Sequence, residues 1–179
     1  SLESRNKMGY DLYGVSPRGV DIKDYPLLDK WEGKSFKERD EMPKNDIEEY
    51  YDQMHQRDSI TGSYFRANVW WWRRLWDFTI QVCDEVMTKD DKSAGDGNDG
   101  IEISKETCAK MLPLMKQAIK DKEHEKMEAE VTQSIADVPK DKNGWPKGDE
   151  NFWAMYPFSA AFFQEFTTFV ERSGGFRIS

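Results

Sequence analysis

Residues 64–78 read Tyr-Phe-Arg-Ala-Asn-Val-Trp-Trp-Trp-Arg-Arg-Leu-Trp-Asp-Phe, and they hold four of the seven tryptophans beside three arginines. Placed on a helix at about 100° per residue, the apolar side chains cover roughly half of the circumference. This width predicts a central helix that is capped by Ser63, runs to about Thr88 and is wedged among other helices. Its apolar face consists of Phe65, Val69, Trp72, Trp76, Ile80 and Cys83, widened by Tyr64, Trp71, Leu75, Phe78, Val82 and Val86.

Two residues of this helix depart from the pattern. Trp70 projects into the polar sector among the arginines, and Asn68 falls inside the apolar sector. A flat indole beside guanidinium groups can hold a base or another planar anion. The structural alternatives are that Trp70 is covered by the loop from Ser16 to Met42 or by a second copy of the chain, and that Asn68 satisfies a buried backbone group. The candidate ligand-binding residues of this stretch are Arg66, Asn68, Trp70, Arg73 and Arg74.

The composition bounds the class of protein. With 179 residues and 37% hydrophobic content, the chain predicts one domain over residues 8–179. The net charge of −8 argues against general binding to a nucleic-acid backbone, which requires clustered positive charge. No stretch approaches the roughly 20 apolar residues of a membrane span, so we expect a protein of the cytoplasm. Residues 1–7 are interpreted as a remnant of the expression vector before Met8.

The two cysteines and two histidines predict no cofactor. Cys83 and Cys108 fall at apolar helical positions without a metal-ligand spacing, so we expect buried, reduced thiols. His55 and His124 lie in polar stretches typical of solvated side chains, away from any nucleophile. No specific catalytic constellation is present. A carboxylate-based hydrolase that uses Asp96, Asp99 or Glu102 remains an alternative.

Two acidic loops invite comparison with calcium sites. The loop from Asp90 to Asp99 does not have the spacing of a calcium-binding loop. A second loop matches in part but has Pro139 at the first ligand position. We therefore predict no metal, and whether either loop binds a cation stays open. The residues concerned are Asp96 and Asp99 in the first loop and Asp141, Asn143 and Glu150 in the second.

The rest of the chain predicts a mainly α (α+β) fold, in which the two termini form a small β-sheet around the tryptophan helix. Phe176-Arg177-Ile178 alternates and could pair with a strand near Tyr10. Residues 16–43 read as an extended loop with a few apolar anchors, and Lys89–Gly100 lacks any apolar repeat. The remaining expected elements are a helix over 45–56, a helix capped by Ser104 with a bend or break near Leu112 before Pro113, a surface helix over 122–138, and a last helix from Ser159 to the glycines at 174 and 175.

Several motifs together resemble a family of small uncharacterised bacteriophage and prophage proteins. The resemblance covers most of the chain, and the triple-tryptophan string is its most specific part. Family members carry proline where Arg74 stands, and many have a zinc-ribbon insert that this chain lacks, so no zinc role is carried over. The resemblance adds Asn98 and Asp99 to the candidate ligand-binding residues. The shared segments are Tyr64–Trp76, Gly9–Leu12, Asn98–Gly100, Tyr156–Ser159 and Ser173–Phe176.

Three functions are compatible with a phage protein in the cytoplasm of the host cell. The first is a binding protein that sequesters a small anionic or nucleotide-like ligand, for example a nucleotide-derived immune signal of the host. The second is an inhibitor that binds a host protein through exposed aromatic side chains. The third is a hydrolase of such a signal. We favour ligand capture over catalysis. The aromatic anchors of the second reading would be Trp31, Trp70, Trp145 and Trp153.

Overall fold

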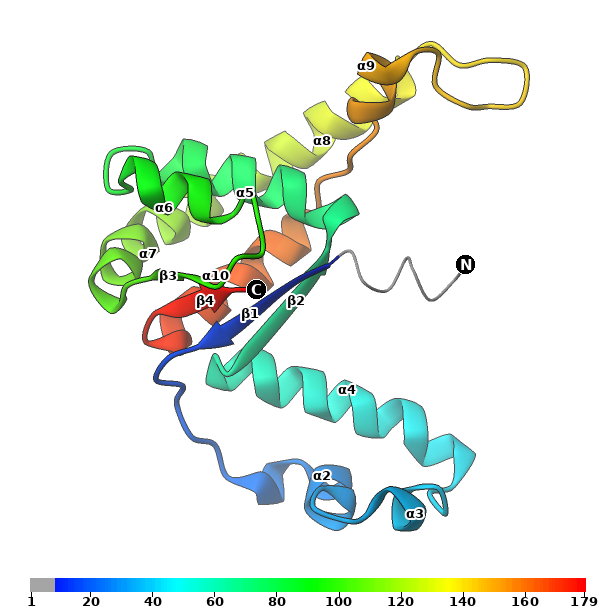
Figure 1. Ribbon diagram of the computed structural model, residues 1–179, viewed down its shortest axis with the longest axis vertical. Coiled ribbons are helices and arrows are strands. Elements are labelled where there is room, and N and C mark those ends of the chain that lie inside the picture. Colours follow the sequence, from blue (N-terminus) through cyan, green and yellow to red (C-terminus); the bar gives the residue numbers. More distant parts are fainter. Residues whose placement is uncertain (1–8) are drawn as a thin grey trace.

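A computed structural model describes residues 9–179 of the chain (Figure 1). The interpretation of residues 1–7 lies outside this range. The fold is mainly helical with a small antiparallel sheet, which confirms the predicted class. In chain order, the elements are β1 (Gly9–Gly14), η1 (Ile22–Asp24), α2 (Pro26–Trp31), α3 (Phe36–Arg39), α4 (Lys44–Thr61), β2 (Tyr64–Asn68), α5 (Val69–Cys83), α6 (Lys89–Ala94), β3 (Ile101–Ile103), α7 (Lys105–Lys120), α8 (Glu123–Ala136), α9 (Asp149–Trp153), α10 (Ala160–Ser173) and β4 (Phe176–Ile178).

The sheet joins the two ends of the described chain. Strand β4 pairs with β1 in antiparallel register, with Leu12 opposite Ile178, as the alternation of both segments predicted. Two further strands complete the order β2-β1-β4-β3. Leu12 and Ile178 are both fully buried, because α10 packs on the sheet and closes the core over this face.

The prediction of one helix from Ser63 to about Thr88 was wrong at both ends. Residues 64–68 form β2, which pairs with β1 along its whole length, and α5 begins only at Val69. Phe65 and Ala67 alternate inward while Arg66 and Asn68 stay exposed, which is the period of a strand. At the other end, α5 stops at Cys83. The stretch predicted as one helix therefore consists of strand β2, helix α5 and a turn after Cys83.

The core helix α5 is nevertheless central. Trp72 and Trp76 are 0% and 1% exposed, and their rings stack at 5.2 Å between centroids. Each indole N–H donates to a backbone carbonyl, Trp72 to Gly95 at 2.8 Å and Trp76 to Lys92 at 2.9 Å. These acceptors belong to α6 and the turn after it, in a region predicted to lack a repeat. The indoles thus satisfy their own polar groups and dock a short helix that has little apolar surface.

Helices α7, α8 and α10 share the remaining core with the strands. Ser104 caps α7 as predicted, and the last helix begins where it was expected, with Ser159 as its N-cap. Gly174 ends α10 with a φ of 64°. Of the bend or break predicted near Leu112, the break is absent, because α7 continues through Pro113. Helix α8 has the narrow apolar face expected of a surface helix, with Val131 buried.

His124 corrects a prediction made from sequence. The side chain is 1% exposed instead of solvated, and its Nε2 lies 2.8 Å from the amide nitrogen of Gln164. Its Nδ1 has no hydrogen-bond partner within the described residues. The local sequence around His124 is polar, but α10 covers this one position of α8.

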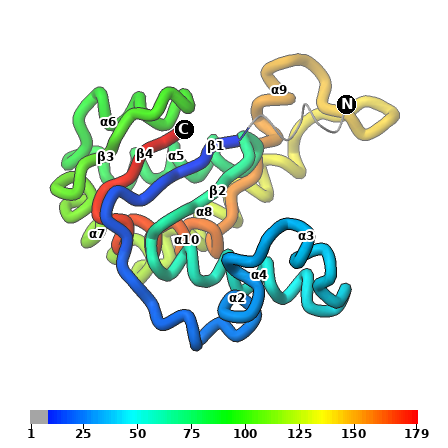
Figure 2. Tube along the Cα trace, turned by 60° about the horizontal axis from the view of Figure 1, so that its bottom comes forward, coloured from blue at the N-terminus to red at the C-terminus, as the bar shows by residue number. Residues whose placement is uncertain are grey.

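The segment predicted as an extended loop over residues 16–43 is instead partly helical. It carries η1, α2 and α3 and wraps around α4 (Figures 1 and 2). A second small apolar cluster holds it there, with Leu27 and Trp31 packed against its edge. Phe36 is 76% exposed and takes no part in this cluster. The buried members of the cluster are Tyr25, Leu28, Met42 and Tyr50.

The segment from Pro139 to Tyr156 extends beyond the end of α8 as an arm (Figures 1 and 2). It contains a turn at Gly144, as predicted, an isolated bridge between Lys140 and Pro146, and then α9. No helix between residues 9 and 179 has the combination of length and apolar character that crossing a bilayer requires.

Candidate functional site

A groove lies between α4, β2 and α10. Its main part has a volume of about 750 Å³ and continues into two smaller hollows of about 370 Å³ each, one towards α5 and one along α4. Arg66, Asn68, Phe162 and Glu165 line both the main part and the hollow towards α5, so they mark the centre of the groove.

Helix α4 forms one wall. Asp52, His55 and Ser59 recur at steps of three and four residues, which places them on one face of the helix. The groove face of α4 is polar, whereas the face towards α2 carries the apolar cluster. His55 is exposed, as predicted, but it lies in the groove.

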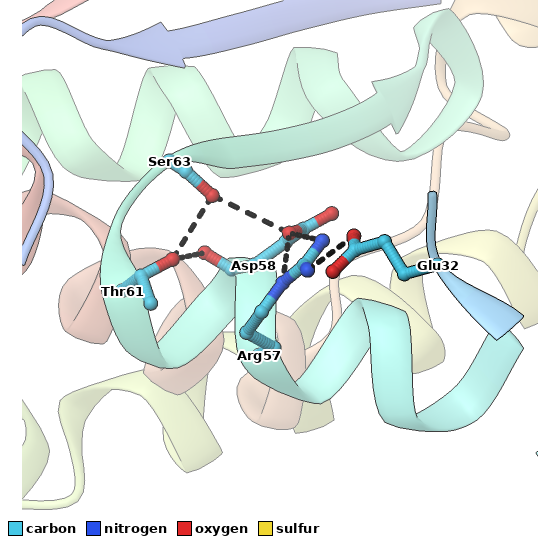
Figure 3. A network of polar contacts seen from close by, with 5 residues as sticks. All are labelled: Glu32, Arg57, Asp58, Thr61 and Ser63. Atoms are coloured by element: carbon cyan, nitrogen blue, oxygen red, sulfur yellow. Dashed lines mark hydrogen bonds and ion pairs between the residues drawn. The ribbon is translucent and has the colours of Figure 1, made fainter. Parts of the chain in front are cut away.

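A polar network holds the end of α4 in place (Figure 3). The guanidinium of Arg57 pairs with Glu32, which follows α2, and with Asp58 at 3.0 Å. The hydroxyl groups of Thr61 and Ser63 lie 2.9 Å apart at the turn into β2, and Ser63 donates to Asp58. This network joins the N-terminal segment, α4 and β2, and so fixes Asp58 at the groove wall.

Strand β2, at the edge of the sheet, borders the groove. Tyr64, Arg66 and Asn68 line the groove from one face of the strand, and Phe65 and Ala67 line it from the other. Arg66 faces Asp11 of β1 in the register, with Nε 3.6 Å from Oδ1. Tyr64 donates its hydroxyl proton to the same carboxylate, and burial together with this bond raises the pKa of Tyr64. Arg66 is therefore oriented by a neighbouring strand while its side chain stays 52% exposed.

Helix α10 forms the opposite wall. The ring of Phe162 stacks on Phe65 at 4.9 Å between centroids. Glu165, one turn further on, has its pKa raised by burial. No hydrogen bond or ion pair joins the Glu165 side chain to any of residues 9–179. At the mouth of the groove, Trp71 is 39% exposed.

The predicted site residues divide among three places. Arg66 and Asn68 lie in the groove. Trp70 is partly covered by the arm, with its ring 4.8 Å from Tyr156, and Arg74 donates to the carbonyls of Tyr156 and Ala154.

The other predicted residues lie apart from the groove. Asn98 and Asp99 precede β3, at the edge of the sheet opposite to β2. Arg73 lies on α5, and its Nε is buried without a hydrogen-bond partner in the described chain. The interpretation of Trp70 and the three arginines as one cluster therefore does not match the geometry, since Arg66 belongs to a strand and the others to a helix.

Sequence reasoning missed most of the residues that line the groove, and three of them show why. His55 and Glu165 are more than 100 positions apart, and neither stands in a motif. Trp71 was assigned to the widened edge of the apolar face, but it lies in the first turn of α5 and is 39% exposed. The available signal was Asn68, whose preference for the N-cap places the start of the helix just before Trp71.

The groove offers both signs of charge and an aromatic surface. Arg66 and Asn68 supply donors, Glu165 and Asp58 supply acceptors, and Phe162 and Trp71 supply ring faces. No group of three or more His, Cys, Asp or Glu side chains in the described part of the chain is placed to hold a metal ion. Cys83 and Cys108 are free and buried, and burial raises the pKa of both thiols to about 12.

Comparison with known proteins adds no relative. No protein-family model, no curated protein and no solved structure matches this chain.

Proposed function

We propose that this chain is a small binding protein whose groove captures a nucleotide-like ligand. One observation carries the proposal: Arg66, Glu165 and Phe162 line the same part of a groove of about 750 Å³. The volume is in the range of pockets that bury small organic ligands, roughly 300–1,000 Å³. A cation, an acceptor and a ring face in one groove match the phosphate, the amino edge and the base of a nucleotide.

The carboxylate of Glu165 indicates which kind of ligand group the groove recognises. An ionised carboxylate only accepts hydrogen bonds, so it pairs with a ligand edge that carries N–H groups, such as a base with an exocyclic amine. The Glu165 side chain is exposed, partial burial raises its pKa, and no side-chain hydrogen bond or ion pair holds it within the described residues. The carboxylate is therefore accessible to an N–H donor of a ligand.

The aromatic and cationic groups complete the recognition. Stacking of a base on an aromatic side chain contributes about 1–3 kcal/mol. Phe162 and the half-exposed Trp71 are placed for this role in the groove and at its mouth. Arg66, held by Asp11, offers donors to a phosphate or carboxylate.

The phage resemblance supplies the biological setting of the proposal. A protein that sequesters a nucleotide-derived immune signal requires tight binding without turnover. Donors, acceptors and ring faces are sufficient for that task. Under this proposal, the ligand would be a small signal molecule in the cytoplasm of an infected host cell.

A nucleotide panel tests the proposal. We expect thermal stabilisation by at least one nucleotide, with the ligand recovered intact by chromatography. Glu165→Gln and Trp71→Ala should each weaken this binding by about tenfold, the loss expected for one charged hydrogen bond or one stacked ring. Glu125→Gln and Trp145→Ala are matched controls, since both residues are exposed and outside the groove. Recovery of a hydrolysed product would favour the hydrolase instead.

A second candidate is a protein-binding inhibitor, and the arm favours it. Trp145 and Trp153 are 66% and 56% exposed, and Phe152 beside them is 44% exposed. Large aromatic side chains of this kind are frequent anchors of protein interfaces. Of the other predicted anchors, Trp31 packs against the cluster around α4 and Trp70 contacts the arm. Loss of a host partner in Trp145→Ala/Trp153→Ala, with no response to any nucleotide, would support this candidate over the first.

A further inference from the structure

A separate cavity of about 320 Å³ lies where α10 ends and α7 begins. Three cationic side chains line it: Arg18 from the segment after β1, Lys105 from the first turn of α7, and Arg172 from the last turn of α10. It shares no residue with the groove. Its chemistry is therefore independent of the function proposed above.

Backbone hydrogen bonds hold the segment that carries Arg18 close to the end of α10. The N–H of Ser16 donates to the carbonyl of Ser173 at 2.8 Å, and the N–H of Arg18 donates to Thr61 at the same distance. Gly174 permits this contact: its φ is 64°, and a Cβ there would lie 2.8 Å from the Cβ of Ser16. The segment that carries Arg18 is thus pinned to the end of α10.

The three cations have no carboxylate partners. Within residues 9–179, no ion pair or side-chain hydrogen bond involves Arg18, Lys105 or Arg172. The one acidic residue among the described lining residues, Glu171, is itself paired with Lys116 at 2.8 Å. Arg18 and Lys105 are exposed and Arg172 is half-buried, so the cavity presents to solvent three cationic side chains that no carboxylate neutralises.

Two details of this cavity favour an anion. The Nε of Arg172 is buried and has no hydrogen-bond partner in the described chain, and an unsatisfied buried donor is costly. Cys108 lines the cavity, but burial raises the pKa of its thiol to about 12, so the thiol adds no negative charge.

Helix dipoles explain only part of the arrangement. Arg172 lies near the C-terminus of α10, where a cation is favoured. Lys105 lies at the N-terminus of α7, where a cation is disfavoured and only the neighbouring Glu106 has the favourable sign. An acceptor from solution would satisfy both the helix end and the three side chains at once.

We propose that this cavity is a binding site for a tetrahedral oxyanion, either free phosphate or the phosphate of a small phosphomonoester. Guanidinium groups match phosphate oxygens in pairs, and an ammonium group adds a point charge. The volume of about 320 Å³ is at the lower end for small-molecule pockets, which suits a ligand of this size.

Calorimetric titration of the whole chain at constant ionic strength tests the site, with inorganic phosphate as the probe and chloride as the reference. We expect saturable binding of one phosphate, weakened by at least about tenfold in Arg18→Gln/Lys105→Gln, because two charged contacts are lost. The matched control is Arg39→Gln/Lys110→Gln: it removes the same two charges from exposed positions outside the cavity. This control should bind like the wild type.

Adenosine 5′-monophosphate distinguishes the two sources of the oxyanion. Tighter binding than for phosphate, with the same loss in Arg18→Gln/Lys105→Gln, identifies a phosphomonoester as the ligand. If adenosine 5′-monophosphate still binds the double variant but binds Glu165→Gln more weakly, it occupies the groove. The titration with inorganic phosphate is then the test of the cavity. Absence of saturable binding of either probe to the cavity, or an equal loss in the control variant, would overturn the proposal.

Discussion

The side chain of Asn68 accepts a hydrogen bond from the backbone N–H of Trp71 at 3.0 Å, so the residue that ends β2 also begins α5. Asn68 lines the groove as well. A change at this position therefore has two separable consequences. One is the stability of the strand–helix junction, and the other is the binding of a ligand.

Asn68→Ala should lower the free energy of unfolding by about 1 kcal/mol, because alanine cannot cap the helix. Asn68→Asp should retain most of the stability, since aspartate is an equally good cap and its charge suits a helix N-terminus. Chemical denaturation measures both. If the two variants are equally unstable, capping is not the role of Asn68. A loss of ligand binding in Asn68→Asp alone would assign the amide to recognition.

Gly95→Ala should destabilise the protein by about 1–3 kcal/mol, the usual cost of overpacking. An added Cβ would lie 2.2 Å from the ring of Trp76, which is buried and cannot move aside. Gly19→Ala is the matched control, because no atom lies within 4 Å of its added Cβ. Thermal melts of the two variants give the comparison. Equal melting temperatures would contradict the packing of α6 against the indoles of α5.

The ion pair between Arg57 and Glu32 should couple the N-terminal segment to α4. Their side chains are 21% and 36% exposed, so a double-mutant cycle with Arg57→Gln and Glu32→Gln should give a coupling of about 0.5–1 kcal/mol. The same variants should speed limited proteolysis within residues 16–43, because that segment has only a small apolar cluster to hold it. Strictly additive stabilities would show that the network in Figure 3 contributes no coupling.

Glu165→Gln should raise the melting temperature near pH 7, and this gain should shrink as the pH falls towards 4. Burial raises the pKa of Glu165 above 4.5, so the folded protein holds this proton more tightly than the unfolded chain does. The charged form thus costs stability above the folded pKa, and the cost vanishes below the unfolded pKa. Melts across this pH range test the sign.

The control for this pH series is Glu125→Gln, which removes the same charge from an exposed position on α8. It corrects for the general effect of lowering the negative charge of the chain. A Glu165→Gln variant less stable than wild type at pH 7 would mean that the carboxylate makes a favourable contact in the folded protein.

Local chemistry made several elements predictable. The cap at Ser104, the helix start near Ser159 and the left-handed glycine at 174 each depend on chemistry within one helical turn, so a single sequence reveals them. The alternation near Tyr10 and in Phe176–Ile178 predicted that the two segments would pair. These signals required no knowledge of distant residues.

Other elements depended on partners that the local pattern does not contain. Residues 64–68 fit both a helical and a strand period, and pairing with β1 decided for the strand. Helix α6 has little apolar surface, but its backbone carbonyl at Lys92 and that of Gly95 after it accept the indole protons of α5. In both cases, the deciding contact comes from another part of the chain.

The sequence by itself determined the fold class, the central place of the tryptophan helix and the joining of the termini, because alternation, caps and glycines act over a few residues. Only the tertiary structure decided the site: it separated Trp70 from Arg66 and brought His55 and Glu165 into one groove. The reason is physical. The groove forms where α4 packs against α10. Which residues meet there depends on where the helices end and on the strand register, and both are set by contacts between distant parts of the chain.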